Sequence, residues 1–300
     1  MKKLDLNLLL RTLGTLLAFA LLLVLLSQQG WDEIWAGVRQ ISGAHFVLSI
    51  VFMLGSRTAV ALRWHALLRS GGVNVTFWQS WKITFAGLFA SNFLPTTIGG
   101  DVVRLAMALR AGFDKVISAA SLVVDRLVGM AGMATAAPFG LPPILGTAPL
   151  ASGAIFSARV AHPWLDKGKR AAEKLWQATG LWIRSPRGLL LAFALTWVHQ
   201  LFLYACNWIL FEGLGDPIPF WLAGGLWSFT YFVTLLPVSI NGLGVQELSM
   251  TFIFSQFGGV SAQNAAIVAL LVRTLQALAS VPGAAFLPDI LNQARAKTDE

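Results

Sequence analysis

The chain is dominated by apolar segments that run for close to twenty residues with few or no charges. As a helix, a segment of that length crosses about 30 Å of hydrocarbon. Only 12% of the residues are charged, whereas a soluble domain carries about 25%. A transmembrane β-barrel is excluded because the apolar runs are continuous rather than alternating. The sequence therefore predicts an all-α, polytopic membrane protein that forms a single integral membrane domain over residues 1–300.

We expect about eight membrane-spanning helices, near residues 8–27, 44–64, 78–95, 116–137, 138–158, 188–211, 219–237 and 263–286. The segment 138–158 holds four prolines, each of which disturbs a helix interior, so it is either a kinked span or a folded loop. Two further apolar helices, near 99–112 and 244–257, reach only roughly 21 Å. They are therefore expected to be re-entrant helices or the second arms of broken ones.

Two short stretches interrupt the apolar segments in the same way. Residues 92–104 and 237–247 each place a proline, then paired glycines and then a carboxylate: Pro95, Gly99, Gly100 and Asp101 in the first stretch, and Pro237, Gly242, Gly244 and Glu247 in the second. Backbone that leaves a helix at membrane depth must be covered by protein or line a wet cavity. Paired interrupted segments indicate a transporter-like site between two repeats, with these prolines and glycines at its gates.

The two halves also match beyond the breaks. Asp101 is followed 25 residues later by Arg126, and Glu247 is followed 26 residues later by Arg273. We therefore expect residues 44–137 and 188–286 to form an inverted repeat. Chance similarity between apolar helices is the competing explanation.

Six ionisable residues are expected at membrane depth: Asp101, Arg104, Asp125, Arg126, Glu247 and Arg273. A charged side chain at the bilayer centre costs on the order of 2.5–3.5 kcal/mol, so these residues must cluster and neutralise one another. The simplest symmetric arrangement pairs Asp101 with Arg273, and Glu247 with Arg126. Static salt bridges that only hold helices together are the alternative to a binding site.

The same residue types suit an anionic ligand. Each pair of glycines opens a short helix, whose N-terminal N–H groups favour an anion, although Asp101 and Glu247 can cap these ends instead. The arginines Arg104, Arg126 and Arg273 supply fork-shaped donors for phosphate. Amide side chains at the breaks have either a structural or a substrate-facing role: Asn92, Asn241 and Gln246. Arg63 is expected to snorkel to the interface, and Arg57 is a weaker site candidate.

Several classes of function are excluded. The formal charge is +8, but the basic residues lie between apolar segments, where membrane topology requires them, so we expect no nucleic-acid partner. A single cysteine and four scattered histidines offer no metal-binding pattern, and we expect neither a metal nor a cofactor. No nucleotide-binding P-loop is present, so any transport must be downhill or coupled to an ion or proton gradient.

Basic residues predict the orientation. Lys2, Lys3 and Arg11 place the N-terminus in the cytoplasm, and Arg295 and Lys297 place the C-terminus there. The connector 159–187 is rich in Lys and Arg and is also expected to be cytoplasmic, either as an interfacial helix or as a solvated loop. The expected location is a bacterial-type inner (plasma) membrane.

Three groups of residues carry a resemblance to a known family: Asn92-x-x-Pro95 followed by Gly99-Gly100-Asp101-x-x-Arg104, the pair Asp125-Arg126, and Pro237 followed by Gly242-x-Gly244-x-x-Glu247. In these residues the chain resembles the flippase-like transmembrane domain of lysylphosphatidylglycerol synthases, over about residues 8–290. The resemblance implies two re-entrant or broken helices and a role in moving a polar lipid between leaflets. The soluble aminoacyl-transferring domain of the bifunctional synthases has no counterpart before Glu300, so we expect no lysyltransferase activity.

We therefore expect a lipid translocase rather than an enzyme, without catalytic residues. Its partner would be an anionic or aminoacylated phospholipid, or a polyprenyl-linked glycolipid. The three arginines would bind the head group, and Asp101 and Glu247 would pair with them when the site is empty. Two alternatives stay open: an intramembrane enzyme with Asp125 or Asp101 as general base, and a membrane scaffold whose charges are structural.

Overall fold

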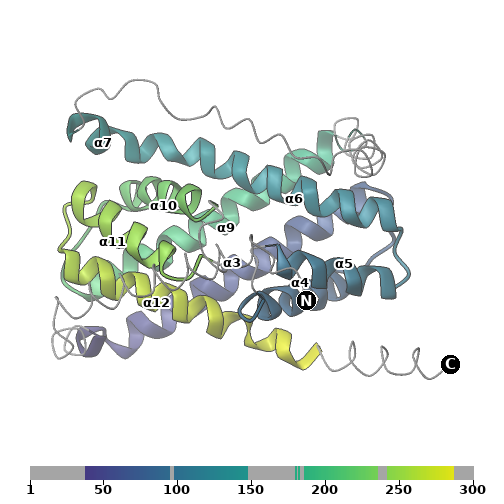
Figure 1. Ribbon diagram of the computed structural model, residues 1–300, viewed down its shortest axis with the longest axis horizontal. Coiled ribbons are helices and arrows are strands. Elements are labelled where there is room, and N and C mark those ends of the chain that lie inside the picture. Colours follow the sequence, from purple (N-terminus) through teal and green to yellow (C-terminus); the bar gives the residue numbers. More distant parts are fainter. Residues whose placement is uncertain are drawn as a thin grey trace, which may run out of the picture.

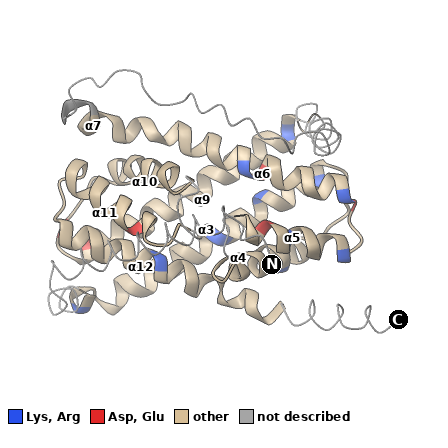
Figure 2. Ribbon diagram, viewed as in Figure 1, with Lys and Arg blue, Asp and Glu red and all other residues tan. Residues whose placement is uncertain are grey.

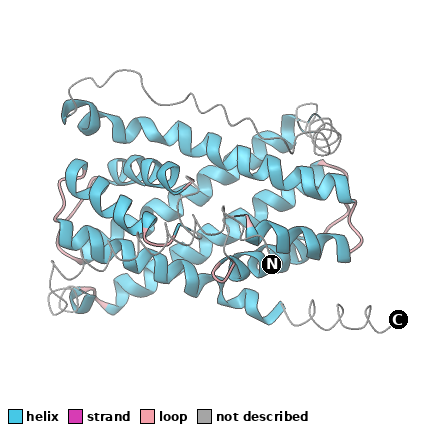
Figure 3. Cartoon of the chain, viewed as in Figure 1, coloured by secondary structure: helices cyan, strands magenta, loops and turns pink. Residues whose placement is uncertain are grey.

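A computed structural model describes residues 38–94, 98–147, 180, 182, 186–235 and 242–286. Within these residues the regular structure is entirely helical (Figure 3), which confirms the all-α prediction. The elements are α3 Gly43–Ser70, α4 Phe77–Ser91, α5 Gly99–Arg110, α6 Lys115–Ala136, η1 Ala137–Gly140, α7 Leu141–Thr147, α9 Pro186–Gly213, α10 Phe220–Thr234, α11 Val245–Phe257, α12 Ala262–Ser280 and η3 Val281–Phe286.

Four helical segments in the described part of the chain are long and apolar enough to cross a membrane: Gly43–Ser70, Lys115–Ile144, Pro186–Gly213 and Ala262–Phe286. Their mean hydropathy lies between 1.5 and 1.7. They coincide with the predicted spans 44–64, 116–137, 188–211 and 263–286. The predicted span 8–27 lies outside the described residues, so the expected total of about eight spans is not confirmed.

The segment 138–158 does not begin a separate span in the part that the structure describes. Residues 137–144 continue from α6 through the short helix η1 into α7, and together they count as one apolar segment, Lys115–Ile144. Pro138 lies in the first turn of η1, where the helix changes from α to 3-10 geometry. Residues 148–158 lie outside the described residues.

The predicted spans 78–95 and 219–237 are shorter than expected. The helices found there, α4 and α10, have 15 residues each, or about 22 Å of helix. This length is below the roughly 20 residues that a span needs. Helix α4 ends at Ser91, which fits the bias against helical backbone immediately before a proline such as Pro95.

Each of these short helices packs against the short helix that follows it. Helix α4 lies against α5, which has 12 residues, and α10 lies against α11, which has 13. Figure 1 shows α4 and α5 towards one end of the long axis and α10 and α11 towards the other, with α3, α6, α9 and α12 running alongside. We call α4–α5 the first hairpin and α10–α11 the second hairpin.

Glycines allow the close backbone contact within the first hairpin. A Cβ atom added to Gly100 would lie 2.7 Å from the carbonyl oxygen of Gly87, and one added to Gly87 would lie 2.7 Å from the carbonyl oxygen of Gly100. No larger residue fits such a contact without separating the two helices. The close contact of the two backbones in the first hairpin is therefore made at Gly87 and Gly100.

The second hairpin uses its glycines to turn the backbone. Gly242 has φ +70° and Gly244 has φ +78°, in the left-handed region that other residues rarely adopt. Glycine at both positions lets the chain reverse direction immediately before α11.

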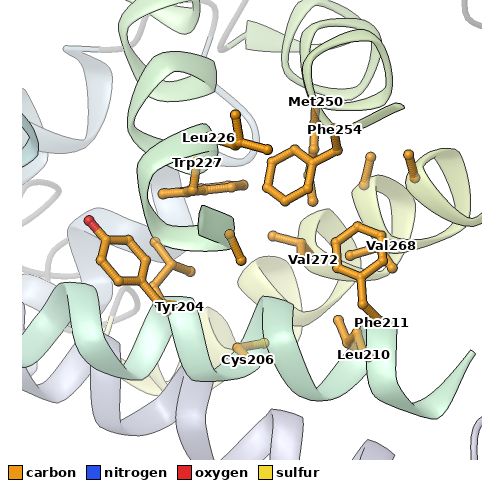
Figure 4. Close-up of a cluster of buried hydrophobic side chains, with 14 of the residues drawn as sticks. Tyr204, Cys206, Leu210, Phe211, Leu226, Trp227, Met250, Phe254, Val268 and Val272 are labelled. Carbon is orange, nitrogen blue, oxygen red and sulfur yellow. The ribbon is translucent and has the colours of Figure 1, made fainter. Parts of the chain in front are cut away.

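The largest apolar core joins α9, α10, α11 and α12, and includes the buried Cys206. Figure 4 shows Phe254, Met250, Leu226 and Trp227 above side chains of α9, with Val268 and Val272 beside them. The rings of Phe211 and Phe254 stack with centroids 5.4 Å apart. Because lipid tails are as apolar as these side chains, close packing rather than exclusion of water holds such helices together.

The last described segment fastens to the first hairpin. Helix α12 continues into η3, which packs along α4. At Gly283 an added Cβ atom would lie 2.0 Å from the carbonyl oxygen of Phe85, so the two backbones are in direct contact. The end of the second half therefore rests on a helix of the first.

Candidate functional site

A central cavity of about 330 Å³ lies between the two halves of the chain. Its walls come from α3, α4, α5, α6, α9, α10, α11 and α12. Figure 2 shows that charged positions are sparse along the helices, with acidic positions on α5 and α11 and a basic one on α12 towards the middle. The arginine, aspartate and histidine side chains that line the cavity are Arg57, Arg63, Asp101, Arg104, Asp125, Arg126, His199 and Arg273.

Five of these side chains form one continuous network, with arginines and carboxylates alternating. Arg63 donates from Nε to Asp125 Oδ1 at 2.7 Å. Arg104 donates from Nη1 to Asp125 Oδ2 and to Asp101 Oδ1, both at 3.1 Å. Arg126 donates from Nε to Asp101 Oδ2. Helices α3, α5 and α6 are therefore joined through buried charge.

A second, smaller group sits where the second half breaks. Arg273 on α12 donates from Nε to Glu247 Oε1 at 2.6 Å and from Nη2 to the carbonyl oxygen of Gly242 at 3.0 Å. The other carboxylate oxygen of Glu247 accepts the backbone N–H of Gly244 at 2.8 Å, which caps α11. Glu247 thus caps the start of α11 and also forms the ion pair with Arg273, which lines the cavity.

The charges gather in one place, as expected, but their pairing differs from the prediction. Asp101 pairs with Arg126 and Glu247 pairs with Arg273, so each carboxylate finds its partner within its own half. The predicted crosswise pairs, Asp101 with Arg273 and Glu247 with Arg126, are wrong. The reason is local: α5 packs against α6, and α11 packs against α12, so the nearest guanidinium is on the next helix.

Arg63 also differs from its prediction. Its residue surface is only 7% exposed, and it binds Asp125 and donates to Thr196 Oγ1 at 3.3 Å instead of snorkelling. Helix α3 continues to Ser70, six residues beyond the predicted end of the span at residue 64. Arg63 therefore lies inside the helix rather than near its end.

Arg104 is held on three sides. Its carbon Cζ lies 4.5 Å from the centre of the Trp64 ring, a cation–π contact. Its Nη1 binds two carboxylates, while its buried Nε and Nη2 have no hydrogen-bond partner among the described residues. The residue is 6% exposed, so it belongs to the wall of the cavity more than to its open surface.

The amide side chains have different surroundings. Asn92 lines the cavity and donates from Nδ2 to Ser280 Oγ at 2.8 Å. Gln246 also lines the cavity, and its buried Nε2 has no hydrogen-bond partner among the described residues. Asn241, Pro95 and Pro237 lie outside the described residues.

Two cavity residues received little or no weight from the sequence. One is His199 on α9, which belongs to no recognisable sequence motif. Its Nδ1 lies 2.7 Å from the hydroxyl oxygen of Ser56. Arg57 lines the cavity from α3, six residues before Arg63 on the same helix. The sequence did contain an indication of this position, namely two arginines within one apolar helix. A charged residue inside a spanning helix usually faces the interior of the protein.

Comparison with known proteins agrees with this architecture. The family described as the lysylphosphatidylglycerol synthase TM region matches residues 11–283. The UPF0104 membrane protein of Archaeoglobus fulgidus is 21% identical over 288 residues, which cover 82% of this chain and 86% of that protein. The match extends over both hairpins and all the described walls of the cavity. The chain belongs to the lysylphosphatidylglycerol synthase TM region family.

Proposed function

We propose that this protein moves the head group of a lipid between leaflets through the central cavity, while the acyl or prenyl tails stay in the bilayer. The observation that carries the proposal is the contrast between the inside and the outside of the helices. The cavity is lined by arginines and carboxylates from both halves. The outer faces expose apolar side chains, such as Val47 on α3, Leu190 on α9 and Phe252 on α11.

The size of the cavity suits a head group rather than a whole lipid. Its volume of about 330 Å³ lies at the lower end of the range for small-molecule sites. The side chain of Arg126 is 39% exposed and that of Arg273 is 22% exposed, although both are in ion pairs. These two guanidiniums are therefore accessible to a phosphate, whereas the side chains of Arg63 and Arg104 are almost fully buried.

The ion pairs provide a way to couple binding to movement. A phosphate that binds Arg273 competes with Glu247, which also caps the first turn of α11. A phosphate that binds Arg126 competes with Asp101 in the first turn of α5. In this proposal, α5 and α11 are the moving gates, and the head group loosens them by taking their partners.

The arrangement of the hairpins supports alternating access. Each hairpin pairs two helices that are too short to span by themselves, and the first residues after each break reach the same cavity. Their placement towards opposite ends of the long axis (Figure 1) supports the inverted repeat that we propose for residues 44–137 and 188–286. Transport would be downhill or coupled to an ion or proton gradient.

The test is lipid scrambling in proteoliposomes with fluorescent phospholipid analogues. We expect the wild-type protein to accelerate scrambling, and Arg126→Gln and Arg273→Gln to slow it at least about tenfold, because each removes a charge-assisted hydrogen bond to the head group. Arg69→Gln is the matched control, since Arg69 is an exposed arginine at the end of α3. Normal scrambling by both cavity variants would contradict the proposal.

The same variants separate the other readings. An intramembrane enzyme would consume a lipid substrate, and mass spectrometry of the liposome lipids would detect the product. A scaffold would show no scrambling in the wild type, and the cavity variants would change only the yield of folded protein. Either result would replace the translocase proposal.

A further inference from the structure

A second, smaller cavity adjoins the central one, and we call it the side pocket. Its volume is about 150 Å³, and its walls come from α3, α4, α5 and α6. It shares Asp101 and Arg104 with the central cavity, whereas Thr84 and Gly100 line the side pocket alone. The side pocket therefore extends the central cavity towards the first hairpin.

Arg104 has a hydrogen-bonding edge that no described residue uses. A guanidinium has five N–H donors, and Nη1 of Arg104 supplies two of them, to Asp125 and Asp101. Its Nε and Nη2 hold the other three, and both atoms are buried without a hydrogen-bond partner among the described residues. Since both aspartates bind Nη1, they leave the edge between Nε and Nη2 clear. Two adjacent N–H groups of this kind bind two oxygens of one carboxylate or phosphate.

Thr84 adds a second unpartnered group to the side pocket. The residue is 0% exposed, and its hydroxyl has no hydrogen-bond partner in the described part of the chain. A threonine within a helix can give its hydroxyl to the carbonyl oxygen four residues earlier, as Thr251 does with Glu247. Thr84 makes no such bond, so its hydroxyl is available to a molecule in the side pocket.

The surroundings of Arg104 fix its position. A Cβ atom added to Gly87 would lie 2.6 Å from Cγ and 3.1 Å from Cδ of Arg104, so a side chain at this position would displace the stem of the arginine. The ring of Trp64 holds the guanidinium by the cation–π contact. The donors of Arg104 are thus oriented before a ligand binds, which reduces the ordering that binding must pay for.

We propose that the side pocket is a further binding site, for one phosphate-type oxyanion held by the Nε–Nη2 edge of Arg104 and the hydroxyl of Thr84. A volume of about 150 Å³ admits a molecule of the size of benzene, so a phosphate group fits. Phosphate oxygens are strong acceptors and match these donors. The site is additional to the proposed function, in which the head group meets Arg126 and Arg273.

The test is binding of radiolabelled inorganic phosphate, measured by equilibrium dialysis of the full chain in dodecyl maltoside, a detergent without phosphate. We expect saturable binding of one phosphate per chain. Arg104→Lys should weaken the binding at least about tenfold, because lysine keeps the charge but lacks the fork. Thr84→Val should weaken it at least about fivefold, because it removes a hydrogen bond to a charged group. Wild-type affinity in either variant would overturn the inference.

Thr84→Val is the sharper variant, because Thr84 lines the side pocket alone and its hydroxyl has no described protein partner to lose. Without phosphate, the variant should be at least as stable as the wild type, since valine removes a buried unpartnered group. If Arg104→Lys does not fold, Thr84→Val decides the inference. The matched control is Thr251→Val, at a buried threonine outside both cavities, which should bind phosphate as the wild type does.

Short-chain phosphatidic acid separates the two sources of the phosphate group. Tighter binding of inorganic phosphate than of phosphatidic acid assigns the side pocket to a free anion. Tighter binding of phosphatidic acid, weakened by Thr84→Val, assigns it to a lipid phosphate that enters from the central cavity. If Thr84→Val weakens the binding of neither compound, the side pocket holds only water and the inference is wrong.

Failure of this inference is distinguishable from failure of the proposed function. Phosphate binding that depends on Thr84, without scrambling of any lipid, would refute the proposed function and leave the side pocket as a binding site. Lipid scrambling by the wild type, with no phosphate compound bound through Thr84, would refute the site and leave the function.

Discussion

Asn92, where the first hairpin turns, donates a 2.8 Å hydrogen bond to the hydroxyl of Ser280, the last residue of α12. The two residues are 188 positions apart in the chain. This contact joins the break in the first half to the final long helix of the second half at the edge of the cavity.

Replacing Asn92 by Ala should lower the stability of the folded protein by about 1 kcal/mol, the usual net value of such a hydrogen bond. Ser280→Ala should have a similar effect, and the double variant should cost less than the two single changes added together. Thermal unfolding in detergent measures this coupling. Strictly additive effects would mean that the bond contributes nothing.

The two oxygens of Glu247 serve different partners, and two substitutions separate them. Glu247→Gln keeps an oxygen that can accept the Gly244 N–H but removes the ion pair with Arg273. Glu247→Ala removes both, so we expect it to be the more destabilising, by up to about 3 kcal/mol because a buried pair is broken. Denaturant unfolding measured by tryptophan fluorescence compares them. Equal stability of the two variants would show that the cap has no effect.

Asp125 is 2% exposed and neutralises both Arg63 and Arg104. Asp125→Asn would leave two buried guanidiniums poorly paired, and we expect a loss of about 3–5 kcal/mol. Adding Arg63→Gln to that variant should recover part of the loss, because it removes one of the stranded charges. The measurement is the fraction of monodisperse protein after heating in detergent. A double variant less stable than Asp125→Asn alone would contradict this electrostatic explanation.

Gly100 tests the packing of the first hairpin. Gly100→Ala would place a methyl group 2.7 Å from the backbone oxygen of Gly87, and we expect a loss of about 1–3 kcal/mol from overpacking. Gly43 is the control, since a Cβ atom there meets nothing within 4 Å. Gly43→Ala should be neutral or stabilising by up to about 1 kcal/mol. Similar melting temperatures for both variants would refute the tight contact.

Hydropathy and motif spacing were enough to predict the helical membrane fold and the gathering of six charged residues: Asp101, Arg104, Asp125, Arg126, Glu247 and Arg273. Apolar length identified the helices that became α3, α6, α9 and α12, and the paired glycines and carboxylates identified the starts of α5 and α11. The equal spacing from Asp101 to Arg126 and from Glu247 to Arg273 already contained the true pairs, because a short helix and its successor bring those positions together. Symmetry suggested crossed pairs, but local packing determines the partner.

Other features depend on tertiary contacts that a linear pattern does not contain. Predicting that Arg63 is buried required knowing where α3 ends. Hydropathy placed that end at residue 64, whereas the helix continues to Ser70. Placing Arg57 and His199 at the cavity required knowing which face of α3 and α9 turns towards it. Both helices are apolar on nearly every side, so their sequences give little indication of that face.

The backbone contact between Gly283 and Phe85 has a mechanical consequence. It clamps η3 onto α4, so α4 and the end of α12 have no room to slide past each other. We therefore expect this pair to act as a fixed frame, with displacement in the first hairpin confined to α5. An engineered disulfide between α4 and η3 would then leave lipid scrambling unchanged, while one between α4 and α5 would abolish it.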